Sequence, residues 1–193
     1  RVERFRGRAD IALDTVGIGQ ARSIAARTSY WNVAAVYSSP LKRAIQTAQP
    51  TASWLKQEVH HLDGVTDVDY GDWQGLTVEQ VEKRNPDIFA QWRYIPQSTR
   101  FPRGESLEEV RQRAADSMKQ LVSSHDGEFF IVVSHVVICR LLILHFLSLA
   151  TSHFWNIRQD NGAINLFEFR DALPIAMSIN ETCHLRQAIE RSL

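Results

Sequence analysis

A serine and a histidine interrupt an apolar run in the stretch FFIVVSHVVICR, which covers residues 129–140. An unbroken run rich in β-branched residues is typical of a strand that is buried on both faces in a parallel sheet. Ser134 and His135 follow this strand at its C-terminal end, where open α/β sheets hold their ligands. His135 is therefore a candidate site residue. The alternative is a histidine that only completes its hydrogen bonds at a strand–helix junction.

A second stretch whose residue types could form a binding or catalytic site is SSPLKRAIQTA, residues 38–48. It predicts a helix that opens at Ser39-Pro40, with the serine as cap, and that continues to Leu55. The N-terminus of a helix favours an anion, yet Lys42 and Arg43 place two cations in the first turn. This favours a cation held there to meet a negative ligand, and the alternative is a solvated basic turn.

The stretch DVDYGDWQG, residues 67–75, combines aspartates, glycines and aromatic residues in a loop. Such a loop can hold a carboxylate beside a ligand, or it can be a surface loop pinned by Tyr70 and Trp73. Its spacing does not match a calcium-binding EF-hand loop. Two weaker candidates are Glu105, in the turn PRGES, and the arginine-rich opening stretch RVERFRGR, which is either a basic arm or a phosphate-facing loop.

The remaining pattern alternates strands and helices, which predicts one α/β domain over residues 1–193: a three-layer α/β/α sandwich with a mainly parallel central sheet. Two capping boxes, at Thr77 and Ser106, predict helix starts. The predicted strands are 33–37, 58–62, 129–133, 163–169 and 175–179, the last two as an antiparallel edge pair, and the predicted helices are 15–27, 39–55, one from 77, 87–93, one from 106, and one from the end of the 129–133 strand through 149.

Composition narrows the class of protein further. The 22 basic and 22 acidic side chains cancel, so no global field draws the chain to nucleic acid or to an anionic membrane. The longest apolar stretch, residues 136–150, is too short to span a bilayer. Cys139 and Cys183 lack metal-type spacing and indicate a reducing compartment, so we predict a cytoplasmic protein; a homodimer is compatible with the sequence.

Taken together and in order, these stretches resemble the histidine phosphatase superfamily, which includes cofactor-dependent phosphoglycerate mutases and α-ribazole phosphatases. The resemblance covers essentially the whole chain. It rests on the segments RFRGRADIALDTVGIGQA, YSSPLKRAIQTA, DVDYGDWQGL, GESLEEVRQR and VVSHVVICRLL. It implies a phosphoglycerate mutase-like fold.

The resemblance also implies roles for individual residues. Arg43 would hold the transferred phosphoryl group, Asp67 would be the general acid where many members have glutamate, and His135 would be the second histidine of the pocket. The residues expected to contact substrate or phosphate are Arg6, Gly7, Tyr70 (an aromatic at the rim) and Val136.

Two features depart from the family pattern. The motif Leu-x-Arg-His-Gly, which supplies the nucleophilic histidine on the first strand of family members, is not found in the 193 residues. We therefore expect this strand upstream of the sequence. Val136 stands where many members have glycine, which narrows the approach to the pocket.

The implied activity is metal-independent hydrolysis of a small phosphomonoester through a phosphohistidine, with no cofactor. Family mutases carry a long insertion after the loop that corresponds to residues 67–75, which we call the acidic loop. Here the stretch that follows it, from Leu76 to Gly104, is short, which favours hydrolysis. The alternatives are a mutase-type phosphotransferase and a catalytically silent phosphate-binding or regulatory domain of the same fold.

Overall fold

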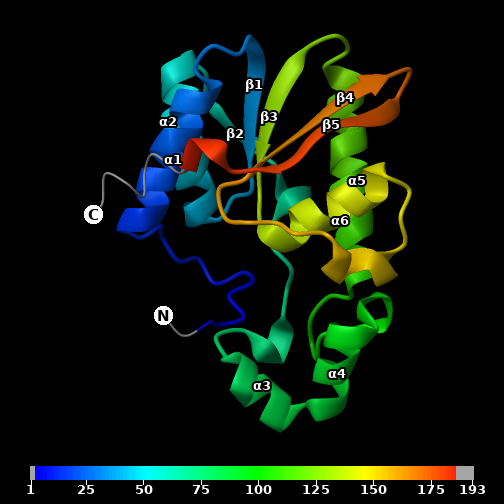
Figure 1. Ribbon diagram of the computed structural model, residues 1–193. Coiled ribbons are helices and arrows are strands. Elements are labelled where there is room, and N and C mark those ends of the chain that lie inside the picture. The colour runs from blue at the N-terminus through cyan, green and yellow to red at the C-terminus, as the bar shows by residue number, and fades with distance from the viewer. Residues whose placement is uncertain (1–2, 186–193) are drawn as a thin grey trace.

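The computed structural model describes residues 3–185, so both ends of the predicted 1–193 domain lie outside the described residues. The helices are α1 (Thr15–Thr28), α2 (Lys42–Leu55), α3 (Val78–Arg84), α4 (Pro86–Tyr94), α5 (Leu107–Ser124) and α6 (Val136–Phe146), and the strands are β1 (Val33–Ser38), β2 (Val59–His61), β3 (Phe129–Val133), β4 (Ile164–Arg170) and β5 (Leu173–Glu181) (Figure 1). Across residues 3–185, no helix combines the length and apolar character needed to cross a membrane.

The strands form two separate sheets. The central sheet is parallel, with the order β2-β1-β3, and Val36 of β1 lies opposite both Val59 and Ile131. β4 and β5 pair antiparallel as predicted, but they form a two-stranded sheet of their own. Within the described residues, β3 is therefore hydrogen-bonded along one edge only, to β1.

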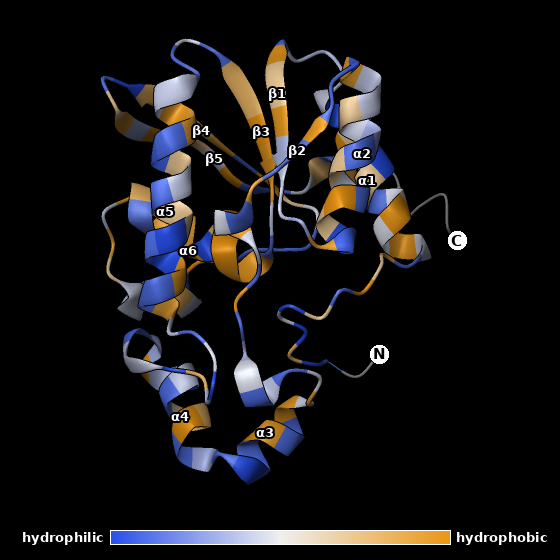
Figure 2. Cartoon of the chain, turned by 180° about the vertical axis from the view of Figure 1, so that it is seen from behind, coloured by the Kyte–Doolittle hydropathy of each residue, from blue (hydrophilic) through white to orange (hydrophobic). Residues whose placement is uncertain are grey.

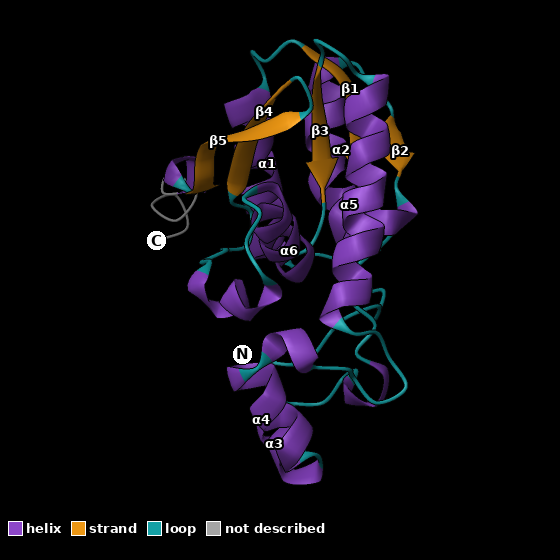
Figure 3. Cartoon of the chain, turned by 90° about the vertical axis from the view of Figure 1, so that its right-hand side faces the viewer, coloured by secondary structure: helices purple, strands orange, loops and turns teal. Residues whose placement is uncertain are grey.

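Helices cover both faces of the central sheet, which confirms the predicted layered α/β architecture. α1 and α2 lie on one side, and α5 and α6 lie on the other (Figures 1 and 3). Successive side chains of β1 serve opposite faces: Val36 packs with Ala48 and Ala52 of α2, whereas Tyr37 packs against the cluster on the α5 side. Figure 2 shows β1 and β3 as largely hydrophobic strands between helices that have one polar and one apolar side.

An aromatic cluster extends the core from α5 and α6 into the lobe formed by α3 and α4. Trp73 and Phe101 are fully buried, with ring centroids 5.2 Å apart, and Phe101 packs on Trp92 at 5.3 Å. The indole Nε1 of Trp73 donates a 3.0 Å hydrogen bond to Asn85 Oδ1, so its polar edge is satisfied. Because Trp73 belongs to residues 67–75, this packing holds that loop against the α3–α4 lobe.

Both predicted capping boxes are present. At the start of α5, Ser106 Oγ accepts from the Glu109 N–H at 3.3 Å, and Glu109 Oε2 accepts from the Ser106 N–H at 2.8 Å. The box of α3 has the same reciprocal bonds between Thr77 and Gln80.

Two predicted helix boundaries were wrong. α2 begins at Lys42 rather than at Ser39, and its first N–H donates to Asp10 Oδ1 at 2.7 Å, so a side chain distant in sequence replaces the expected local serine cap. α6 ends at Phe146 rather than Leu149, because Ser148 adopts a left-handed φ of 55° that cannot continue a helix.

Gly64 lies where the chain leading to the acidic loop touches α5, and we predict that Gly64→Ala destabilises the fold. A Cβ at this position would overlap Ser117 Oγ and lie 2.9 Å from the Arg113 carbonyl oxygen. Overpacking of this kind costs about 1–3 kcal/mol of unfolding free energy. Urea denaturation measures the change. Gly19→Ala, in α1 with nothing within 4 Å of the new methyl, is the matched control and should leave stability unchanged or raise it. Equal stability of the two variants would contradict the packing described.

Candidate active site

The C-terminal ends of β1 and β3 bring two chemically important segments together. Ser38 lies opposite Val133 in the parallel register, and the Ser39 N–H donates to the Val133 carbonyl at 2.9 Å. Ser39 and His135 therefore leave neighbouring strands at the same edge, and His135 Nε2 lies 2.8 Å from Ser39 Oγ. This is the edge where open α/β sheets bind ligands.

Arg43 connects three segments from the first turn of α2. Its Nη1 donates to the Ala9 carbonyl at 2.8 Å, and its Nη2 donates to the Gly7 carbonyl at 2.6 Å and to Asp67 Oδ2 at 3.0 Å. The guanidinium thus holds the opening loop and the acidic loop against the helix. That Arg43 meets a negative ligand stays a prediction, and the exposed Lys42 pairs with Asp10 at 3.4 Å.

Asp67 is a buried carboxyl at the centre of this cluster. Its Oδ1 accepts from the Val68 N–H at 3.0 Å, and its Oδ2 lies 3.7 Å from His135 Nδ1. Burial raises the pKa of Asp67 from 3.8 to about 6, although Arg43 and the Val68 N–H favour the carboxylate. A carboxyl with such a pKa can carry a proton near neutral pH and release it, as a general acid must.

His135 is the N-cap of α6 and is 7% exposed. Burial, together with the positive charges of Arg43 and Arg113, lowers the pKa of His135 to about 3. The imidazole is therefore neutral at neutral pH and has one N–H to donate. The neutral imidazole can therefore donate a hydrogen bond to an anionic group beside Arg43 without first taking up a proton.

Gly7 and Arg6 belong to the opening loop that Arg43 holds. Gly7 has a φ of +47°, and a Cβ there would lie 2.7 Å from the Val68 carbonyl oxygen and 2.9 Å from Cδ2 of Tyr70, so the close approach of the two loops requires glycine. Arg6 is exposed and lines the cavity described below.

Tyr70 and Val136 also line this cavity, in different ways. Tyr70 is 7% exposed and packs edge-to-face on Phe5 and Phe101 at centroid distances of 5.0 and 4.8 Å, so it lies deeper than the predicted rim position. Val136 is half-buried and is the first residue of α6. The substrate-binding roles of Arg6, Gly7, Tyr70 and Val136 stay predictions.

The sequence analysis missed two contributors to this site. Ser39 was expected to cap α2, but its hydroxyl is instead hydrogen-bonded to His135. Arg113, the last residue of the GESLEEVRQR segment, reaches the acidic loop from the middle of α5, although no role was predicted for it. Arg113 also pairs with Glu105, which the sequence marked as a weak candidate.

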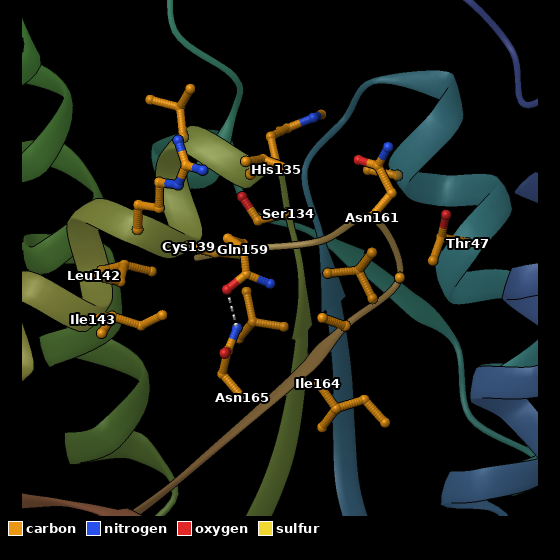
Figure 4. A pocket seen from close by; sticks show the side chains of 18 of the residues that line it. Thr47, Ser134, His135, Cys139, Leu142, Ile143, Gln159, Asn161, Ile164 and Asn165 are labelled. Carbon is orange, nitrogen blue, oxygen red and sulfur yellow. Dashed lines mark hydrogen bonds between the residues drawn. The ribbon is translucent and has the colours of Figure 1, made fainter. Parts of the chain in front are cut away.

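A cavity of about 2450 Å³ runs from the Arg43–Asp67–His135 cluster along β3 to β4. Figure 4 shows His135 and Ser134 at one end of the pocket, Leu142 and Ile143 of α6 along its wall, and Ile164 of β4 toward the other end. The cavity explains why β3 departs from the prediction of full burial on both faces: residue 129 is exposed and residues 130–133 are half-buried, since the edge that faces β4 has no strand partner among the described residues.

Among residues 3–185, no group of three or more histidine, cysteine, aspartate or glutamate side chains is arranged to hold a metal ion. Arg43 and Asp67 are charged side chains that meet at the site.

Comparison with known proteins identifies the class to which this site belongs. Residues 1–182 match the histidine phosphatase superfamily (branch 1), so the chain is a member of that superfamily. Phosphoserine phosphatase 1 of Hydrogenobacter thermophilus is 32% identical over 184 residues, which cover 95% of this chain and 87% of that protein.

Solved structures share the fold. Bacillus stearothermophilus YhfR superposes with a TM-score of 0.91 at 23% identity, covering 94% of this chain and 91% of that one. A phosphoserine phosphatase mutant from Entamoeba histolytica, solved in complex with phosphoserine, has a TM-score of 0.83 at 28% identity and covers 94% of this chain and 90% of its own. The phosphoglycerate mutase-like fold is thereby confirmed.

We predict that the Asp67 carboxyl titrates with a midpoint near pH 6, measured by ¹³C NMR. Because the native state holds this proton more tightly than the unfolded chain, the group stabilises the fold at low pH, and that contribution is lost as pH rises from about 4 through about 6. Arg43→Met should move the midpoint upward, since Arg43 lowers the pKa. Lys42→Met, which removes a cation paired with Asp10, is the control and should not move it. A midpoint near 4, or no response to Arg43→Met, would contradict the geometry.

Proposed function

We propose that the protein is a phosphatase that hydrolyses a small phosphomonoester through a phosphohistidine intermediate, without a metal ion. The observation that carries the proposal is the contact cluster of Arg43, Asp67 and His135 at the C-terminal edge of the parallel sheet. It combines a cation for phosphate oxygens, a neutral hydrogen-bond donor, and a carboxyl whose pKa suits proton transfer. Membership of the histidine phosphatase superfamily supports the same chemistry.

The described residues do not contain the Arg-His-Gly motif that carries the nucleophilic histidine in family members. We propose that a further β-strand lies between β3 and β4, parallel to β3, and ends in the family's Arg-His-Gly. The cavity between these strands and the unpaired edge of β3 support this placement. A parallel strand there would end beside Arg43 and Asp67, because the C-terminal ends of parallel strands share one edge.

Catalysis then proceeds by two in-line displacements. The histidine nitrogen forms a bond to phosphorus as the ester P–O bond breaks, and Asp67 gives its proton to the departing alkoxide. A water molecule then attacks phosphorus, Asp67 takes its proton, and the N–P bond breaks to release phosphate. Arg43 and the neutral His135 stabilise the charge on the equatorial oxygens in both steps.

Binding of the phosphate prepares Asp67 for its first step. A phosphate dianion beside Arg43 competes with Asp67 for the guanidinium, which now donates to Asp67 Oδ2 at 3.0 Å. The added negative charge raises the pKa of the carboxyl further and favours its protonated form. Substrate binding and loading of the acid are therefore coupled through Arg43.

For the substrate, we propose a small phosphorylated metabolite with an alkyl leaving group, and phosphoserine is the first compound to test. The names of the relatives support this choice. The short stretch between the acidic loop and α5 folds into the compact α3–α4 lobe, which favours hydrolysis over mutase activity. The free thiols of Cys139 and Cys183 support the predicted cytoplasmic location, and the homodimer stays a prediction.

The function is tested by supplying the strand as a peptide. We predict that the 193-residue chain, mixed with a synthetic strand peptide ending in Arg-His-Gly, hydrolyses p-nitrophenyl phosphate and phosphoserine in EDTA. A matched peptide with glutamine in place of the histidine should give no turnover. Activity that needs an added divalent ion would contradict the metal-free mechanism. Phosphate binding without turnover with either peptide would favour the silent phosphate-binding domain instead.

The role of Asp67 predicts a dependence on the leaving group. An alkoxide needs a proton in order to depart, whereas nitrophenolate needs little help. In the chain supplemented with the Arg-His-Gly peptide (the strand-completed protein), Asp67→Asn should therefore lower kcat/KM for phosphoserine by about 10²–10⁴-fold and affect kcat/KM for p-nitrophenyl phosphate far less. Asp69→Asn, in the same loop, is the control for the assignment. Equal losses on both substrates for Asp67→Asn, or a selective loss only in Asp69→Asn, would place the general acid elsewhere.

A further inference from the structure

We propose that Arg113 and Glu105 are positioning residues that hold the general acid Asp67 in reach of the leaving group. The inference rests on the proposed function. It assigns the efficiency of leaving-group protonation to an ion pair that itself lies outside the phosphate-binding cluster. The pair acts through hydrogen bonds to the backbone on either side of Asp67.

Arg113 holds the N-terminal side of the acidic loop. From α5, its Nη1 donates to the carbonyls of Gly64 and Thr66 at 2.8 and 2.7 Å, and its Nη2 donates to the carbonyl of Asp67 at 3.2 Å. The planar guanidinium presents its donors in a rigid fork, so these bonds define both the position and the orientation of the loop. No hydrogen bond joins Arg113 to the Asp67 carboxyl among those of the described residues, so Arg113 acts through the backbone.

Glu105 holds Arg113 and the other side of the loop. Its Oε1 and Oε2 accept from Arg113 Nε and Nη2 at 2.8 and 3.0 Å, and Oε2 also accepts from the Asp69 N–H at 2.9 Å. Arg8 adds an ion pair at 3.2 Å. Although burial raises it, hydrogen bonds from Arg113 and from the Asp69 N–H hold the pKa of Glu105 below its usual value. The carboxylate is therefore ionised at neutral pH.

The setting of the pair indicates a role beyond surface solvation. The side chains of Arg113 and Glu105 are 22% and 19% exposed, whereas those of the solvated pair Arg100–Glu109 are 60% and 51% exposed. A displacement of about 1 Å at a catalytic group can cost about a hundredfold in rate. Lysine keeps the charge of Arg113 but presents a single ammonium, which cannot reach the three carbonyls and the carboxylate together.

The experiment compares Arg113→Lys with Arg111→Lys in the strand-completed protein. Arg111 is on the same helix, but it donates to Thr151 rather than to the acidic loop. We expect Arg113→Lys to lower kcat/KM for phosphoserine by up to about a hundredfold and to change kcat/KM for p-nitrophenyl phosphate far less, because kcat/KM reports only the steps up to formation of the phosphohistidine. Arg111→Lys should leave kcat/KM unchanged for both substrates. A uniform loss of kcat/KM on both substrates, at unchanged stability in urea, would overturn the proposal.

A double-mutant cycle separates positioning from a general structural role. If Arg113 acts by placing Asp67, Arg113→Lys should cost nothing further on phosphoserine once Asp67→Asn is present. Additive losses would overturn the proposal. Should Arg113→Lys fail to fold, Glu105→Gln is the second variant, and the same selective loss and the same lack of additivity are expected.

A readout without catalysis keeps this test independent of the proposed function. In the absence of any turnover by the parent protein, which would count against the function, ¹³C NMR of Asp67 still decides the inference. Arg113→Lys should move the titration midpoint of Asp67, whereas Arg111→Lys should not. An unmoved Asp67 midpoint in Arg113→Lys would overturn the positioning role.

Discussion

The site depends on one buried ion pair, between Arg43 and Asp67. The two side chains are 15% and 12% exposed, and their atoms approach to 3.0 Å. Removing one partner of a buried pair typically costs about 3–5 kcal/mol, because the other charge is left without compensation. Here Arg43 also donates to the carbonyls of Gly7 and Ala9, so the same cation assembles the opening loop, α2 and the acidic loop.

The same pair explains why a carboxyl with a raised pKa can exist in a folded site. Burial disfavours the charged form of Asp67, and Arg43 offsets this only in part, which leaves the pKa at about 6. A carboxyl with this pKa lies between its two protonation states near neutral pH, and in the proposed mechanism a bound phosphate dianion shifts it toward the protonated one. The pair between Arg113 and Glu105 complements this arrangement, since it binds the loop backbone, whereas Arg43 donates directly to the Asp67 carboxyl.

The sequence predicted those parts of the fold that depend on local patterns. The capping boxes at Thr77 and Ser106, the parallel strands and the antiparallel final pair all follow from short-range signals, and the resemblance to a known family brought Arg43, Asp67 and His135 to one site. Local sequence patterns could not predict that Asp10, rather than Ser39, would accept from the first N–H of α2, because that contact joins segments distant in sequence. For the same reason, the contact of Arg113 with the acidic loop could not be predicted. The split between β3 and β4 was likewise outside the reach of strand patterns, which report apolar runs and not their partners.

The account stands on a covalent phosphohistidine formed at the edge where β1 and β3 end. The most direct measurement is to mix the chain and the Arg-His-Gly strand peptide with a phosphomonoester, quench at alkaline pH during turnover, and map the phosphoryl group by mass spectrometry. The account predicts an acid-labile phosphoryl group on the histidine of the peptide. With p-nitrophenyl phosphate as substrate, it also predicts a larger trapped fraction in Asp67→Asn, because Asp67 takes the proton of the water that breaks down the phosphohistidine. A phosphoryl group on His135, or turnover with no phosphorylated histidine, would contradict it.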